Sequence, residues 1–178
     1  MRVLIIAFCV LALAACVAGP TGNSSVPEPA KSVDLQRYKG LWYEFARYEN
    51  RFEKDCEAVT AQYTPQADGV IAVKNSCREA TVDGPLRVSE GKAKPAGDPK
   101  SAKLKVSFFG PALMTNYWVL DHGEAYDWAI VGEGSGRYLW ILTRQARPSA
   151  QERVELIARA KSLGYDTDML RYTEQPAR

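Results

Sequence analysis

Few side chains in this sequence of 178 residues have the types and spacing that catalysis requires. Its one histidine, His122, lies in the turn-like stretch LDHGE, whereas catalytic triads and most zinc sites need histidine beside other reactive or ligating groups. Glu44 and Glu49 are the residues that an acid–base pair would use, but neither a nucleophile nor a further partner accompanies them. The sequence therefore predicts a protein that is not an enzyme and that needs no metal or cofactor.

The first residues predict export from the cytoplasm. Arg2 precedes an apolar run from Val3 to Ala15 that is too short to span a membrane. The run ends in Leu-Ala-Ala-Cys16, which resembles the lipobox of bacterial lipoproteins, and that resemblance implies an acylated Cys16 as the new first residue. An ordinary signal peptide with an incidental cysteine is the alternative. Similar lipoproteins use aspartate beside the cysteine for inner-membrane retention, so Val17 implies an outer-membrane anchor, with the protein facing the periplasm.

The remaining chain divides by composition. Residues 1–15 are expected to be the signal peptide, the Gly-, Pro- and Ser-rich stretch 16–32 a flexible tether, and 33–176 one folded domain. Hydrophobic residues make up 46% of the chain, which suffices for a core. The formal net charge of +2 gives no electrostatic reason to expect nucleic acid as a partner.

Two of the four cysteines, Cys56 and Cys77, belong to the expected domain and lie nearly symmetrically about a turn at 65–69. They should therefore face each other across a hairpin, and an exported protein meets oxidising conditions. A disulfide is expected, although two separate reduced cysteines are the alternative. Direct pairing of the two would misalign the neighbouring apolar residues, so we also expect a bulge between 56 and 59.

Apolar runs recur through the expected domain, separated by Asp-Gly, Gly-Pro and similar turn signals. In SAKLKVSFF, residues 101–109, Leu104, Val106 and Phe108 alternate with polar residues, which is typical of a strand with one dry face. Such strands in hairpin order predict an all-β, eight-stranded, up-and-down antiparallel barrel, with a sandwich as the alternative. The other strands are expected at 41–49, 57–64, 69–77, 86–94, 115–121, 126–132 and 138–144.

One helix is expected after the last of these strands. Ser149 and Glu152 form a capping-box pattern, and Gly164 is suited to end the helix. The helix has a broad apolar arc, and the strand YLWILT at 138–143 is apolar on both faces. We therefore expect a C-terminal α-helix packed outside the barrel on that strand, followed by a short extended segment at 169–174.

Three blocks of residues resemble the lipocalin family. They are GLWYE at 40–44, NYWVLDHG at 116–123 and YLWILTR at 138–144. The resemblance covers about 33–176 and, with the lipobox, is closest to bacterial outer-membrane lipocalins and their apolipoprotein D-like relatives. It implies structural roles for Gly40, Trp42, Asp121 and Arg144 at the closed end of the barrel, where the alternating strand directions also bring these residues together.

The same strand directions place the ligand wall near the opposite, open end. An eight-stranded barrel can hold one small ligand or be filled by its own side chains. Alternation from Trp42 and along the other strands predicts a set of inward-facing residues, while the charges in 47–54 are interpreted as outer face and rim. The predicted ligand-binding residues are Ala46, Tyr48, Val59, Ala61, Tyr63, Asn75, Val106, Phe108, Tyr117 and Tyr138.

The resemblance implies that the protein binds fatty acids or lysophospholipids in the barrel and stores or transports them at the outer membrane. One alternative is a lipocalin-type enzyme that acts on a lipid or isoprenoid. The other is an interaction lipoprotein with a filled barrel, in which Leu113 and Met114 at the rim pair with another protein. A homodimer is compatible with the resemblance, although no residue demands one.

Overall fold

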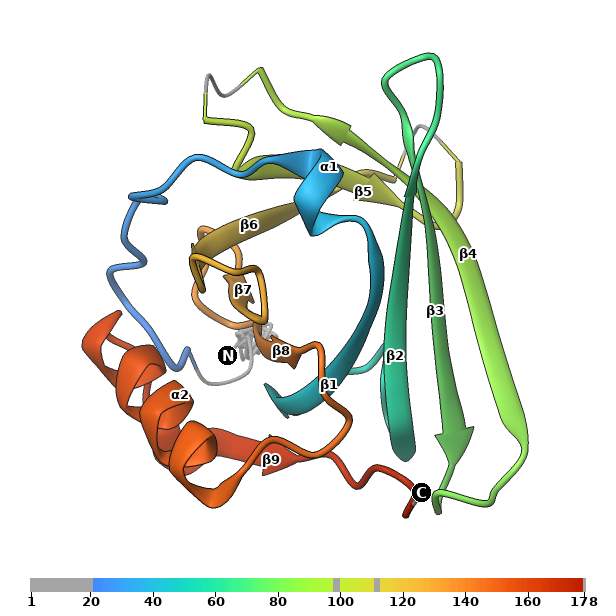
Figure 1. The fold of residues 1–178 in the computed structure, drawn as a ribbon, viewed down its shortest axis with the longest axis vertical. Helices are drawn as coiled ribbons and strands as arrows, with labels where there is room; N and C mark the ends of the chain where they lie inside the picture. Colours follow the sequence, from blue (N-terminus) through green and yellow to red (C-terminus); the bar gives the residue numbers. More distant parts are fainter. Residues whose placement is uncertain (1–20, 98–99, 111–112, 178) are drawn as a thin grey trace, which may run out of the picture.

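The computed structural model describes residues 21–97, 100–110 and 113–177, so the expected signal peptide and Cys16 lie outside the described residues. Figure 1 shows a curled sheet with one long helix beside it. The elements in chain order are α1 (Leu35–Tyr38), β1 (Gly40–Tyr48), β2 (Cys56–Pro65), β3 (Ile71–Glu79), β4 (Leu86–Pro95), β5 (Lys103–Ser107), β6 (Thr115–His122), β7 (Trp128–Gly132), β8 (Leu139–Thr143), α2 (Ala150–Ser162), the 3-10 helix η1 (Thr167–Met169) and β9 (Leu170–Tyr172).

The sheet closes on itself. Strands pair in the order β2-β3-β4-β5-β6-β7-β8-β1-β9, and a further pairing between β1 and β2 completes the ring. All pairings are antiparallel, with each strand from β2 to β8 beside its sequence neighbours. This topology confirms the predicted up-and-down barrel and rules out the sandwich. We call the end with the β1–β2, β3–β4, β5–β6 and β7–β8 loops the open end and the opposite end the closed end.

Helix α2 lies outside the barrel, as predicted. Ser149 caps it through a complete capping box with Glu152, and Gly164, with φ of +90°, follows its last turn. The buried face of the helix, Leu156 and Ala160, packs with Ile141 of β8 and other outward-facing residues of the barrel. The outer apolar face of β8 is therefore buried under the helix.

An aromatic and cationic plug seals the closed end. Trp42 is fully buried, and its indole Nε1 donates a hydrogen bond to the carbonyl of Tyr38 in α1. The Arg144 guanidinium lies 3.7 Å from the Trp42 ring centroid and donates to the backbone carbonyls of residues 37, 38, 39 and 41. Arg144 thus ties α1 to the start of β1. The Gly40 backbone adopts a left-handed φ of +98° here, and a Cβ would lie 3.4 Å from Arg144.

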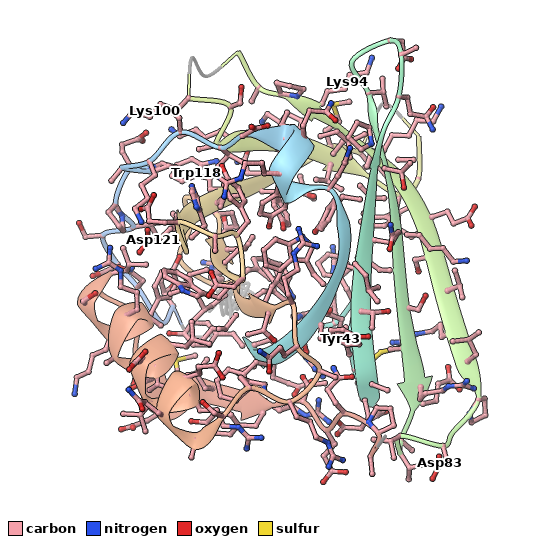
Figure 2. The ribbon with its side chains drawn as sticks, in the orientation of Figure 1. Tyr43, Asp83, Lys94, Lys100, Trp118 and Asp121 are labelled. Carbon is pink, nitrogen blue, oxygen red and sulfur yellow. A yellow bond between two sulfur atoms is a disulfide. The ribbon has the colours of Figure 1, made fainter. Side chains whose placement is uncertain are left out.

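Asp121 lies near the end of β6 at the closed end, as expected. A bulge between Val119 and Asp121 turns this carboxylate to the outer face of β6, where it forms ion pairs with Arg159 of α2 and with Lys31. Figure 2 shows Asp121 on the side of the barrel near α2. These ion pairs hold the helix and the N-terminal segment against the barrel wall.

The N-terminal segment from Gly22 to Ser32, which we expected to be flexible, lies along the barrel. Gly22 and Asn23 donate backbone hydrogen bonds to the carbonyl of Gly136, and the Asn23 side chain donates to the carbonyl of Leu163. At the closed end, the carbonyl of Ser32 lies 3.1 Å from the His122 ring nitrogen Nε2. These contacts hold this part of the expected tether, while the domain boundary at residue 32 stays a prediction.

A disulfide joins Cys56 of β2 to Cys77 of β3, as predicted. A register shift between Glu57 and Thr60 supplies the expected bulge, although Cys56 itself lies opposite Glu79 rather than Cys77. The bond spans 21 residues and packs with Val59 in a small buried cluster near the open end.

Replacing both cysteines by alanine is expected to lower the free energy of unfolding by about 3 kcal/mol, because the unfolded chain regains the freedom of a loop of this length. Urea unfolding measures the change. Dithiothreitol should produce a similar loss in the wild type and none in the double variant. Equal stability of the oxidised wild type and the variant would contradict the prediction.

Candidate functional site

Most of the predicted ligand-binding residues line the inner face of the barrel. Cross-strand partners share a face, and Trp42 lies opposite Ala61, which in turn lies opposite Asn75. The alternation from these pairs, together with the inner core cluster, sets the inward-facing residues of the other strands. The predicted residues on this face are Val59, Ala61, Tyr63, Asn75, Val106, Phe108 and Tyr117.

The predictions for Ala46 and Tyr48 are wrong. The register between β1 and β8 shifts between Glu44 and Ala46, and this bulge moves the later residues of β1 to the opposite faces. Ala46 and Tyr48 therefore belong to the outer cluster beneath α2. The Tyr48 ring lies 5.8 Å from the Tyr165 ring, and its hydroxyl donates to the carbonyl of Asp166.

Two residues that sequence reasoning did not assign to the inner face belong there. Trp140 of β8 is opposite Arg47 of β1 in register, and both face inward. Trp140 stacks on Tyr138, with ring centroids 5.7 Å apart and planes 7° apart, which places predicted Tyr138 beside it at the open end. Continuing the alternation two residues beyond Tyr138 would have assigned Trp140 to the inner face. The inward direction of Arg47 could not be predicted without knowing of the bulge.

The barrel interior is open to solvent on its inner face. Ala61, Phe108, Tyr117 and Trp140 all point inward and pack against the inner core, yet each keeps part of its surface exposed. Because these side chains face inward, their exposed surface lies inside the barrel or at its open end. The accessible surface of these four aromatic or apolar residues marks space on the inner face, which we call the cavity.

Three tyrosines form the floor of this cavity. The Tyr117 hydroxyl lies 2.8 Å from the hydroxyls of both Tyr38 and Tyr63, so side chains from α1, β2 and β6 meet inside the barrel. Burial raises the pKa of Tyr63 to about 12 and the pKa values of the other two well above their usual range, so all three keep their protons. Three hydroxyl hydrogens serve two hydrogen bonds, which leaves one donor for water or a ligand.

Replacing Tyr117 by phenylalanine is expected to lower the free energy of unfolding by about 1–3 kcal/mol, because the buried hydroxyls of Tyr38 and Tyr63 lose their shared partner. Urea unfolding measures the loss. Tyr138→Phe is the matched control, since the Tyr138 hydroxyl makes no hydrogen bond among the residues that the structure describes. A loss no larger than that of the control would show that the three hydroxyls do not stabilise the fold.

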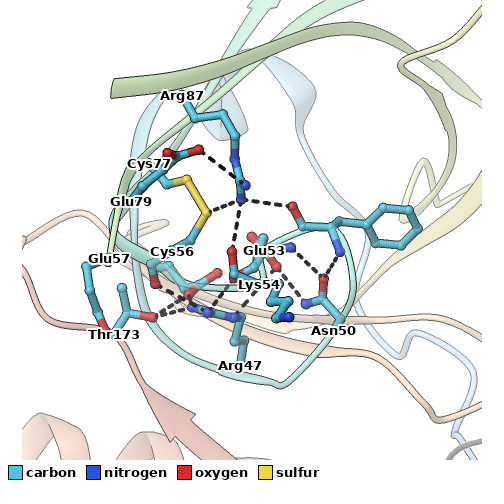
Figure 3. The surroundings of a disulfide bond; sticks show 12 residues. Arg47, Asn50, Glu53, Lys54, Cys56, Glu57, Cys77, Glu79, Arg87 and Thr173 are labelled. Carbon is cyan, nitrogen blue, oxygen red and sulfur yellow. Dashed lines mark hydrogen bonds and ion pairs between the residues drawn. A yellow bond between two sulfur atoms is a disulfide. The ribbon is translucent and has the colours of Figure 1, made fainter. Parts of the chain in front are cut away.

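The β1–β2 loop is fastened to the mouth of the barrel. Glu53 accepts a hydrogen bond of 2.8 Å from the Trp140 indole and one of 2.7 Å from Asn50. Arg87 of β4 donates to the carbonyls of Phe52 and Lys54, as Figure 3 shows beside the disulfide. The loop therefore has a defined position at the mouth.

A buried polar cluster fills the seam where β1 and β2 separate. These strands pair only from Gly40 to Tyr43 on the β1 side, and β9 pairs with β1 beyond that point. Arg47 Nη1 donates to Glu44 Oε1 at 2.6 Å. It also donates to Thr173 Oγ1 at 3.0 Å, while Nη2 donates to the carbonyls of Glu53 and Cys56 (Figure 3). Gln175 bridges the carbonyls of Glu44 and Val59. Arg47 thus belongs to the seam, and its assignment to a solvated outer face is wrong.

Burial raises the pKa of Glu44 to about 8, and the nearby Glu53 acts in the same direction, whereas Arg47 opposes the shift. For an acid whose pKa rises on folding, the protonated form stabilises the folded state. The contribution of Glu44 to the free energy of unfolding should therefore be largest below pH 4.5 and should decrease as the pH rises towards 8. We expect Glu44→Gln to remove this part of the pH dependence, measured by urea unfolding at pH 5 and pH 8. A parallel decline in the variant would contradict the assignment.

Two grooves lie outside the barrel beside α2. One runs between Asp121, Trp128 and Arg159, and the other between Phe45, Ile157 and Tyr172. Both are bordered by the helix and by residues that hold it against the wall, so neither leads to the inner face. In the described residues no group of three or more His, Cys, Asp or Glu side chains is suited to a metal ion. None of the described helices has the length and hydropathy of a membrane span.

Residues 33–175 match the family model described as a lipocalin-like domain. The chain is 39% identical over 158 residues to outer membrane lipoprotein Blc of Escherichia coli K12, covering 85% of this chain and 88% of that protein. It is 34% identical over 178 residues to outer membrane lipoprotein Blc of Vibrio cholerae, covering 98% and 99%. Among solved structures, insecticyanin from Manduca sexta superposes with a TM-score of 0.69 at 21% identity, over 88% of each chain, which shows the shared fold.

Proposed function

Because this chain belongs to the lipocalin family, we propose that it binds an amphiphilic lipid inside the barrel and stores or carries it at the outer membrane. The similarity to outer membrane lipoproteins confirms the predicted lipid-anchored location there. Attachment through an acylated Cys16 is part of the proposal. The ligands that we propose are fatty acids and lysophospholipids, each with a single acyl chain.

The observation that carries the proposal is the partly exposed inner face formed by Ala61, Phe108, Tyr117 and Trp140. These walls offer an acyl chain an apolar surface, and each buried methylene contributes about 0.8 kcal/mol. A chain of ~16 carbons thus gains on the order of 10 kcal/mol before the entropy cost of binding, which supports micromolar or tighter affinity. The head group would remain at the mouth, where Arg51 and Lys54 are exposed.

The same observations weigh against the two alternatives. A barrel filled by its own side chains would bury Ala61 and Tyr117 inside it, whereas both are partly exposed. General acid–base catalysis would need a free carboxylate or similar group in the cavity, but Glu44, the acid nearest to that role, is engaged by Arg47 and Thr173 in the seam. Binding without chemistry is therefore the function that the inner face supports best.

A displacement assay tests the proposal. The delipidated protein is titrated with a fluorescent fatty acid, and the bound probe is then displaced by palmitate or lysophosphatidylethanolamine. We expect saturable probe binding and full displacement at micromolar concentrations of either lipid. Absence of saturable binding would contradict the proposal, as would a probe that neither lipid displaces.

A further inference from the structure

We propose that the open end of the barrel docks on the lipid bilayer, so that the cavity mouth faces the membrane. Two independent features meet at this end: the position of Gly22 in the N-terminal segment, and a group of exposed apolar side chains on the loops. Such docking fixes how the domain is held at the membrane, whichever lipid the cavity takes.

The N-terminal segment lies against the open end at Gly22. Gly22 donates to the carbonyl of Gly136 in the β7–β8 loop, and its own carbonyl accepts a hydrogen bond of 2.8 Å from the Asp166 backbone. A Cβ on Gly22 would lie 2.2 Å from the Tyr48 ring, so the chain passes very close to the barrel wall here. Asn23 is buried beside it and contacts Leu163. These contacts hold Gly22 and Asn23 at the open end.

The short distance along the chain to the anchor restricts the domain. Gly22 is six residues beyond Cys16, and six steps of at most ~3.6 Å span about 20 Å. The barrel wall is longer than that: β2 has 10 residues, which at ~3.3 Å per residue and a tilt of ~40° stand about 25 Å tall. Given the proposed acylation of Cys16, the tether cannot reach past the wall to seat the closed end on the bilayer.

The loops at the open end carry exposed apolar side chains, which we call the apolar rim. Their exposed fractions range from 44% for Met114 to 78% for Phe109, which is unusual for a group of large apolar residues on one end of a domain. They come from the β1–β2 and β5–β6 loops and from the start of β4. The members of the apolar rim are Phe52, Leu86, Phe109, Leu113 and Met114.

A bilayer is the occupant that both features favour. The tether keeps Gly22, which lies at the same end of the barrel as the apolar rim, within about 20 Å of the acyl anchor at all times, whereas a second copy of the chain must first be encountered by diffusion. Side chains such as Phe109 and Leu113 lose their contact with water when they enter the head-group region. A lipid could then pass between the bilayer and the cavity without crossing bulk water.

Site-specific labelling tests this orientation in the full acylated protein. An environment-sensitive fluorophore is attached at Leu113→Cys on the apolar rim or at Ala67→Cys, an exposed position in the β2–β3 turn at the closed end. The protein is reconstituted in phosphatidylethanolamine–phosphatidylglycerol vesicles that contain nitroxide-labelled lipid. We expect at least twofold quenching at position 113 and none at position 67.

Equal quenching at the two positions, or none at 113, would overturn the proposal. Contact between two labels at 113 without quenching by lipid would also overturn it, in favour of a second copy on the apolar rim. A second measurement uses Cys16→Ser, which lacks the acyl anchor. Adding Leu113→Asp to this variant should weaken its binding to the same vesicles at least fivefold. Val154→Asp, at a similarly exposed apolar position on α2, should leave vesicle binding unchanged.

Failure of this proposal and failure of the proposed function give different results. Palmitate should displace the fluorescent fatty acid from Leu113→Asp at the same concentrations as from the wild type, because Leu113 is not part of the inner face. Normal lipid binding in solution without rim contact in vesicles would overturn the docking alone.

Discussion

Replacing Arg47 by methionine is expected to lower the free energy of unfolding by at least about 3 kcal/mol. The side chain is completely buried, and its guanidinium serves Glu44, Thr173 and two backbone carbonyls of the seam. Methionine fills much of the same volume but donates no hydrogen bond, so these acceptors would remain unpaired where water cannot reach them. Each unpaired buried group costs about 1–3 kcal/mol. Urea unfolding of both proteins at one pH measures the difference.

Arg51→Met is the matched control for this change. Arg51 is exposed in the β1–β2 loop, so its replacement should alter the free energy of unfolding by less than about 0.5 kcal/mol. Adding Glu44→Gln to Arg47→Met should cost less than the sum of the two single changes, because the two side chains are partners in one cluster. A loss for Arg47→Met as small as that of the control would contradict the structural role of the seam.

Replacing Ala61 by tryptophan is expected to weaken lipid binding by at least tenfold. Ala61 lies on the inner face between Trp42 and Asn75 on neighbouring strands and keeps part of its surface exposed to the cavity. An indole ring at this position would occupy the space that the acyl chain needs. The affinity is measured by titration with the fluorescent fatty acid, and urea unfolding confirms that the barrel remains folded.

Gln62→Trp provides the control for bulk on the same strand. Gln62 follows Ala61 directly and therefore points to the outer face, opposite Leu41 and Lys74. The control should bind the probe as tightly as the wild type. Unchanged affinity in Ala61→Trp would show that lipid does not occupy the inner face, whereas equal weakening in both variants would show that the effect is not local.

The fold was predictable because its signals are local and repeated. Alternation in residues 101–109, turn residues between the strands and the capping box at Ser149 each depend on near neighbours, and the structure contains the corresponding elements. The disulfide was also predictable, since the turn between Cys56 and Cys77 sets their approximate alignment. Local signals add up to a closed barrel because only closure satisfies both edges of such a sheet.

The inner face of β1 could not be predicted by the same means. A single bulge between Glu44 and Ala46 moves every later residue to the opposite face, and no residue type there marks it. The bulge in β2 was predictable, because direct pairing of Cys56 with Cys77 would have misaligned the apolar residues around Ala61. No comparable mismatch indicates a bulge at Phe45. Strict alternation therefore assigned Tyr48 to the inner face and Arg47 to the outer face.

The seam and the position of Asp121 depend on contacts that are remote in sequence. Thr173 contacts Glu44 across 129 residues, and Asp121 pairs with Arg159 across 38. A carboxylate at the end of a strand gives no indication of which distant cation it will meet. The role of Asp121 therefore became clear only when helix α2 was located against β6.

Native mass spectrometry of the delipidated protein tests the central claim most directly. The protein is titrated with lysophosphatidylethanolamine and palmitate, and Ala61→Trp is analysed in parallel. We predict a complex of one lipid with one protein chain for each ligand, and a strongly reduced fraction of that complex in the variant. No one-to-one complex with either lipid would contradict the account.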